Sequence, residues 1–178
     1  MIAYKLFRID KEGRLHPMFV LANQTIPLGR WLDAKAGPKD KNGYVRSKIG
    51  PLIYRPGWHL SEMPYAPHLG VGWHDKVKPL KPDMVWTKCL IDDRKDFTKD
   101  VEKNGWINGK FYRDKACMYR VPRGGFYWFN TRKDVYGHWM ITGRIKVLEI
   151  LPDEEVERIC WEEFGVHAQP RKGKRIDL

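Results

Sequence analysis

The densest group of side chains suited to ligand chemistry lies at residues 54–61, with the sequence Tyr-Arg-Pro-Gly-Trp-His-Leu-Ser. Arg55 can neutralise a phosphate, and Gly57 lets a ligand approach the backbone. The aromatic rings offer stacking planes, while the histidine and serine add hydrogen-bonding groups. The same residues also fit an ordinary turn and strand, in which Trp58 and His59 point to opposite faces and one of them belongs to the core.

A second concentration of aromatic and basic residues spans residues 120–132. Four successive aromatic residues, Phe126 to Phe129, follow a Gly-Gly turn and are flanked by arginines. Rings beside arginine are typical of single-stranded nucleic-acid binding, where stacking contributes about 1–3 kcal/mol per base. In that interpretation the contacts come from Arg120, Arg123, Tyr127 and Arg132. The alternative is a core strand whose alternate rings pack in two layers.

Three stretches taken in order resemble a known group of proteins. They are Tyr4-Lys5-x-Phe7-Arg8, then Arg55-Pro-Gly-Trp-His-Leu-Ser61, then Pro64-x-Ala-Pro-His-Leu69. Together they look like a group of small phage and prophage proteins and, more distantly, like the ADP-ribosyltransferase-like superfamily. The middle stretch resembles the Gly-aromatic-Tyr motif of that superfamily, with His59 where a tyrosine usually stands. The resemblance implies a cleft between two small sheets that binds NAD as cofactor.

The resemblance also implies a role for each of several residues. Lys5 or Arg8 would pair with the pyrophosphate of NAD, and His59 would hold the ribose. Tyr54 or Trp58 would stack on the nicotinamide ring. The further residues expected to contact the cofactor are Tyr4, Arg55 and Ser61.

In the superfamily a late glutamate steadies the oxocarbenium-like state as nicotinamide leaves. No Glu-x-Glu or Gln-x-Glu pair is present in this sequence, and Glu149 is the nearest counterpart in order and setting. His59 and Glu149 are therefore the expected catalytic residues. They would act through positioning and electrostatic stabilisation rather than through a covalent intermediate.

Charge narrows the classes of partner. Lys and Arg total 33 against 22 acidic residues, a formal net charge of +11. This balance favours nucleotides, nucleic acid or an acidic protein surface. The three cysteines form no Cys-x-x-Cys pair, and the histidine spacings match no metal site, so we expect reduced thiols and no metal. No apolar run approaches the roughly 18 residues of a membrane span, and a cytoplasmic protein without membrane contact is expected.

Most of the elements expected to position these residues are strands. Strands are predicted at residues 2–9, 15–21, 84–91, 117–121, 125–129 and 143–150, and a charged loop at 92–113. Residues 152–164 predict a helix, with proline and acids at its start and Gly165 after its end. We therefore expect one strand-dominated α+β domain over residues 1–169. It would have two small antiparallel sheets, long charged loops and a C-terminal amphipathic helix, followed by a flexible basic tail at 170–178.

Three functions follow from these patterns. The first is an ADP-ribosyltransferase-like protein that binds NAD or another nucleotide, such as a phage or prophage effector acting on host machinery. The second is a basic nucleic-acid-binding module without catalysis. The third is an inhibitory protein that docks on an acidic host protein.

Overall fold

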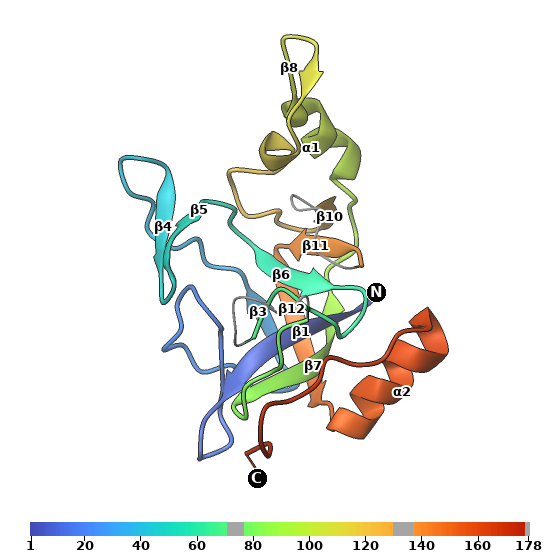
Figure 1. The fold of residues 1–178 in the computed structure, drawn as a ribbon. Helices are drawn as coiled ribbons and strands as arrows, with labels where there is room; N and C mark the ends of the chain where they lie inside the picture. The colour runs from blue at the N-terminus through green and yellow to red at the C-terminus, as the bar shows by residue number, and fades with distance from the viewer. Residues whose placement is uncertain (71–76, 130–136, 177–178) are drawn as a thin grey trace.

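The computed structural model describes residues 1–70, 77–129 and 137–176 of the 178-residue chain. The strands in chain order are β1 (Ile2–Ile9), β2 (Leu15–His16), β3 (Trp31–Asp33), β4 (Tyr44–Ser47), β5 (Gly50–Ile53), β6 (Trp58–Ser61), β7 (Met84–Ile91), β8 (Trp106–Ile107), β9 (Lys110–Phe111), β10 (Phe126–Phe129), β11 (Trp139–Thr142) and β12 (Arg144–Ile150). The helices are α1 (Thr98–Gly105), the short 3-10 helix η1 (Arg113–Lys115) and α2 (Asp153–Phe164). The expected strand-dominated α+β class with a C-terminal helix is confirmed (Figure 1).

Eight strands form one antiparallel sheet in the order β10-β11-β6-β1-β7-β12-β3, with β2 paired to the end of β1. β1 pairs along its length with β7, from Ile2 opposite Leu90 to Arg8 opposite Met84. Its other edge meets β6 only where Tyr4 lies opposite Ser61. Beyond that pair the two strands diverge. Small antiparallel sheets are present, as expected, in the form of the β4–β5 and β8–β9 hairpins, and the eight-stranded sheet stands in addition to them.

Side chains alternate in direction along the central strands, so the hydrophobic core is divided between the two faces of the sheet. Ala3 and Phe7 of β1 join one cluster with Val85 and Cys89 of β7. The intervening Tyr4 and Leu6 of β1 join a second cluster that also contains Trp86 and the buried face of α2. Successive strand residues point to opposite faces, so a single strand contributes to both clusters. A third, smaller cluster lies beneath α1.

Helix α2 follows from local sequence and confirms the prediction for residues 152–164. Pro152 precedes its first turn, three acids lie in that turn, and Gly165 ends it in the left-handed conformation with φ 67°. Val156, Ile159 and Cys160 are its buried residues, at helical spacing. Among the residues that the structure describes, no helix is long and apolar enough to cross a membrane.

Three sequence-based predictions differ from the structure. Residues 117–121 form no strand, and β10 pairs instead with β11, because that register continues the large sheet. The segment 92–113, expected to be a loop, contains α1 and the β8–β9 hairpin. The second strand covers only residues 15–16 of the expected 15–21, and the remainder turns away to line a pocket described below. The differences at residues 117–121 and 15–21 depend on long-range pairing that a local pattern does not report. The β8–β9 hairpin is local, and its signal is the Asn108-Gly109 turn.

The C-terminal segment contacts the domain instead of extending from it as a flexible tail. The Arg171 side chain is only 8% exposed, pairs with Asp153 at 2.7 Å and donates to the carbonyl oxygens of Lys81 and Met84. Ile176 packs on the first hydrophobic cluster. Arginine offers five donors in a fixed fork, so one side chain can hold both a carboxylate and backbone carbonyls. Residues 177–178 lie outside the described residues.

Candidate ligand pocket

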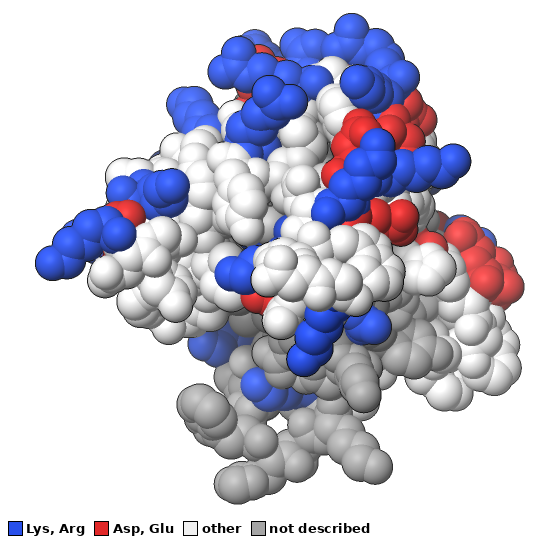
Figure 2. Space-filling view, turned by 90° about the horizontal axis from the view of Figure 1, so that it is seen from above, with Lys and Arg blue, Asp and Glu red and all other residues white. Residues whose placement is uncertain are grey.

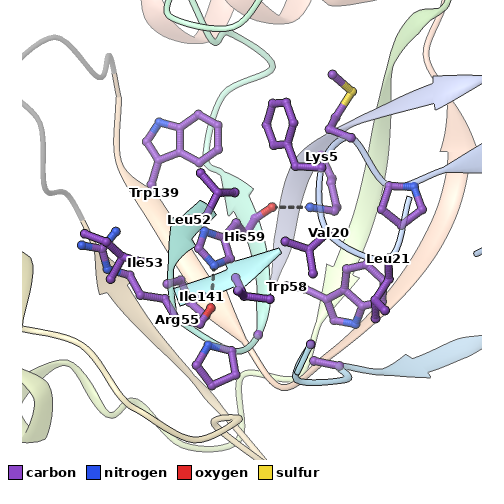
Figure 3. Close-up of a pocket in the computed structure, with 18 of the residues that line it drawn as sticks. Lys5, Val20, Leu21, Leu52, Ile53, Arg55, Trp58, His59, Trp139 and Ile141 are labelled. Atoms are coloured by element: carbon purple, nitrogen blue, oxygen red, sulfur yellow. Dashed lines mark hydrogen bonds between the residues drawn. The ribbon is translucent and has the colours of Figure 1, made fainter. Parts of the chain in front are cut away.

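A pocket of about 330 Å³ opens where β1 and β6 diverge. Residues 17–21 and the β4–β5 hairpin cover it, and the Lys48 amide of that hairpin donates to the Phe19 carbonyl at 3.2 Å. Its apolar walls include Val20, Leu21, Leu52, Ile53, Trp139 and Ile141 (Figure 3). The gap in the sheet thus becomes a cavity because loop residues distant in sequence close over it.

The turn before β6 brings Arg55 and His59 together. Gly57 has φ 146°, and a Cβ atom there would lie 2.3 Å from Cγ2 of Ile141. The turn therefore requires glycine on grounds of both space and conformation. It returns the chain so that Nε2 of His59 donates to the Arg55 carbonyl at 2.9 Å, as Figure 3 shows. With the proton on Nε2, Nδ1 of His59 carries the lone pair.

His59 is an uncharged hydrogen-bonding group at neutral pH. Burial, with the nearby positive charges of Lys5 and Arg55, lowers its pKa to about 4. Its ring also meets Phe129 edge to face, with centroids 6.4 Å apart. Such an imidazole can accept a hydrogen bond from a hydroxyl group, but it does not supply a positive charge for a phosphate.

Lys5 reaches across the gap between the diverging strands. Its Nζ donates to the His59 carbonyl at 2.7 Å and lies 5.6 Å from the centroid of the Trp58 ring and 5.4 Å from that of Phe7. Burial lowers the pKa of Lys5 to about 8, although the charge of a nearby Cys89 thiolate would raise it. The ammonium therefore remains the main form at pH 7, in an apolar setting where its field is only weakly screened.

Arg55 supplies a second cation on the β6 side of the pocket. Its guanidinium lies 4.6 Å from the centroid of the Phe129 ring, and Nη2 donates to the Asp114 carbonyl at 3.4 Å. Nε is buried and has no hydrogen-bond partner. A buried donor without an acceptor is uncommon, and an oxygen of a ligand would satisfy it.

The charge of the lining has one sign. Lys5, Lys35 and Arg55 line the pocket, and no Asp or Glu is among its described lining residues. The described part of the chain also contains no group of three or more His, Cys, Asp or Glu residues that could hold a metal ion. The pocket is therefore suited to an organic anion with an apolar body.

The other residues expected at the cofactor site occupy different environments. Tyr54 and Trp58 line the pocket, but Trp58 is 8% exposed and its Nε1 donates to the Leu32 carbonyl at 3.1 Å, as expected of a core residue. Tyr4 and Ser61 are buried opposite each other and do not line it. Arg8 is also outside the lining, and its Nη2 donates to the Ala22 carbonyl at 3.0 Å.

Glu149 is not brought to His59. It lies on β12, which β7 and β1 separate from β6, and its exposed carboxylate is 3.7 Å from Nζ of Lys88. A β-bulge between Val147 and Glu149 reverses the alternation, so Glu149 no longer shares the face of Val147. The expected pair of catalytic residues therefore does not meet in the pocket.

The segment proposed for nucleic-acid stacking is a core strand. Tyr127 is 0% exposed and belongs to the cluster beneath α1, while Phe126 belongs to the first cluster. The Tyr127 hydroxyl accepts from the Met118 amide at 3.3 Å, so its ring offers no face to a base. Arg120 and Arg123 are exposed, and Arg132 lies outside the described residues.

Sequence reasoning missed part of the pocket. Residues 17–21, Lys35 and Phe129 line it together with the turn at 54–59. Residues 17–21 and Lys35 carried no local signal for a ligand, because loops bring them over a gap between strands. Phe129 belongs to the aromatic segment interpreted as a nucleic-acid surface, and strand β10 places it at the pocket instead. Comparison with protein-family models, with curated proteins and with solved structures found no match to this chain.

Proposed function

We propose that the pocket between β1 and β6 binds a nucleotide or a nucleotide-like anion, with NAD and ADP-ribose as the leading candidates. The single observation that carries this proposal is the lining: three cations and no described carboxylate around largely apolar walls. Such a lining favours a ligand that combines a flat apolar ring with a phosphate.

The positions of the polar groups suggest how the ligand would be held. The phosphate would face Lys5 and Arg55, where the unpartnered Nε of Arg55 supplies a donor. A ribose hydroxyl would donate to Nδ1 of His59, because Nε2 is already engaged with the Arg55 carbonyl. The ring would lie against the apolar walls contributed by the β4–β5 hairpin and β11.

The volume of the cavity and the position of Glu149 limit which ligand and which reaction the pocket supports. The cavity volume of about 330 Å³ is at the lower end of the roughly 300–1,000 Å³ typical of small-molecule sites. One mononucleotide half of NAD would then occupy the pocket and the other half would extend beyond it. Glu149 does not line the pocket. The proposal is therefore nucleotide binding, without ADP-ribosyl transfer through Glu149.

Isothermal titration calorimetry with ADP-ribose, NAD, AMP and nicotinamide tests this function. We expect the phosphate-bearing ligands to bind and nicotinamide alone to bind more weakly. His59→Ala should lower the affinity for ADP-ribose about 5- to 150-fold, because the loss of one buried hydrogen-bond partner removes about 1–3 kcal/mol. The matched control is His167→Ala, since His167 is exposed and contacts Glu157 and Trp161 on α2. Absence of binding by all four ligands, or equal affinity in folded His59→Ala, would contradict the proposal.

A further inference from the structure

The β8–β9 hairpin projects from the domain after α1 and forms the far end of the molecule in Figure 1. Its two-residue turn has Asn108 at φ 50° and Gly109 at φ 75°. Positive φ at both turn positions is the type I′ geometry, which matches the twist of paired strands. Asn-Gly is the preferred sequence for that turn. The hairpin is therefore a locally specified structure that presents its side chains in fixed positions.

Two aromatic rings form one exposed face of this hairpin. Trp106 lies opposite Phe111 in the strand pairing, with ring centroids 5.4 Å apart. The two side chains are 61% and 40% exposed. Phe111 packs so closely on Gly105 that a Cβ atom there would lie 2.5 Å from its ring. The backbone of α1 thus supports the ring pair, which otherwise faces solvent.

Basic residues flank the ring pair along the chain. Residues 103–120 contain five Lys or Arg and one acidic residue, Asp114, a formal net charge of +4. Lys110, Arg113 and Arg120 form no ion pair with another described residue. Lys110 instead lies 5.4 Å from the Tyr112 ring centroid. Seen from the hairpin end, Lys and Arg cover more of the surface than Asp and Glu do (Figure 2).

Two more exposed tyrosines extend the surface. Tyr112 is 39% and Tyr119 56% exposed. Ile107 is the exposed aliphatic residue of the same segment. Exposed aromatic residues alone would also fit a protein partner. The unpaired cations interleaved with planar rings favour a ligand that presents phosphates and flat bases together. Charge complementarity therefore selects nucleic acid over an apolar protein surface.

We propose that residues 103–120 bind single-stranded nucleic acid. Bases stack on the Trp106–Phe111 ring pair, and Lys110, Arg113 and Arg120 neutralise the adjacent phosphates. Stacking tolerates any base, because every base has a flat face, so binding is largely independent of sequence. This surface shares no residue with the nucleotide pocket, and the two proposals stand or fall separately.

Fluorescence anisotropy with a labelled 15-nucleotide oligo(dT), at about 50 mM salt, tests the ring pair. Trp106→Ala should weaken binding about 5- to 150-fold, the range expected for losing one stacked base. The matched control is Trp161→Ala, because Trp161 is a tryptophan of similar exposure, 54%, on α2. Phe111→Leu, which retains an apolar contact with Gly105, should also weaken binding while the melting temperature stays near that of the wild type.

The salt dependence tests the cations. The double variant Lys110→Ala/Arg113→Ala should reduce the slope of log K against log salt by about 1.4, or about 0.7 for each phosphate that is no longer neutralised. The control Lys172→Ala/Lys174→Ala removes two charges from the C-terminal segment and should leave the slope unchanged. Equal losses in Trp106→Ala and Trp161→Ala, or an unchanged slope in the hairpin variant, would overturn the assignment. Absence of oligonucleotide binding by the wild type would also overturn it and leave a protein as the occupant of this surface.

Discussion

Raising the pH above 8 should release a pyrophosphate ligand from the pocket, because Lys5 then loses its charge. Burial lowers the pKa of Lys5 to about 8, so about nine-tenths of the side chain is protonated at pH 7 and about 3% at pH 9.5. If only the ammonium form binds the pyrophosphate, the affinity falls about 30-fold over this interval. That is about 2 kcal/mol, within the range of roughly 1.5–3 kcal/mol for hydrogen bonds to charged groups.

Two groups near Lys5, His59 and Cys89, change little in charge between pH 7 and 9.5. The pKa of His59 is lowered to about 4 and that of Cys89 is raised to about 11, mainly because both groups are buried. The pyrophosphate of ADP-ribose is ionised throughout. Of Lys5, His59 and Cys89, Lys5 alone is therefore expected to change its charge over this interval.

Isothermal titration with ADP-ribose at constant ionic strength measures this effect. Lys5→Arg should bind with an affinity that varies little from pH 7 to 9.5, because guanidinium does not deprotonate there. Lys5→Met should bind at pH 7 about as weakly as the wild type does at pH 9.5. Unchanged wild-type affinity across the interval, or the same 30-fold decrease in Lys5→Arg, would contradict control of the affinity by the charge of Lys5.

Further predictions concern stability and thiol access. Gly57→Ala should lower the free energy of unfolding by about 2–4 kcal/mol, because the new Cβ atom would clash with Ile141 and alanine is strained at this positive φ. Gly43→Ala is the control: φ is 84° there but the space is open, so the loss should be only about 1 kcal/mol. A denaturant titration measures both values. Arg171→Ala should lower the free energy of unfolding by about 2 kcal/mol, because it removes the ion pair with Asp153 and two hydrogen bonds to backbone carbonyls. An unchanged urea midpoint would show that these contacts of the C-terminal segment add no stability. A maleimide should label none of the three cysteines in the native protein and all of them in urea. Burial excludes the reagent from every thiol and raises the pKa of the Cys89 and Cys160 thiols. Rapid labelling of the native protein would contradict the burial of Cys89, Cys117 and Cys160.

Several elements of the fold could be predicted from the sequence because their causes are local. The alternation of residues 84–91 specifies a strand with Val85 and Cys89 on one face, and both are fully buried in the structure. Helix α2 carries its own start and stop signals and a periodic buried face. The strand alternation at 58–61 likewise distinguishes Trp58, a buried residue of the first cluster, from His59, which is only partly buried; both line the pocket.

Tertiary structure alone decided which of the candidate residues meet. The approach of Lys5 to His59 arises because β1 and β6 pair at only one position and then diverge, and strand pairing is a non-local property. The bulge in β12 turned Glu149 away from the face of Val147, although uninterrupted alternation would have kept the two on one face. Sequence thus determined which residue types were available at 54–61, while the pairing of distant strands determined which of them share a pocket.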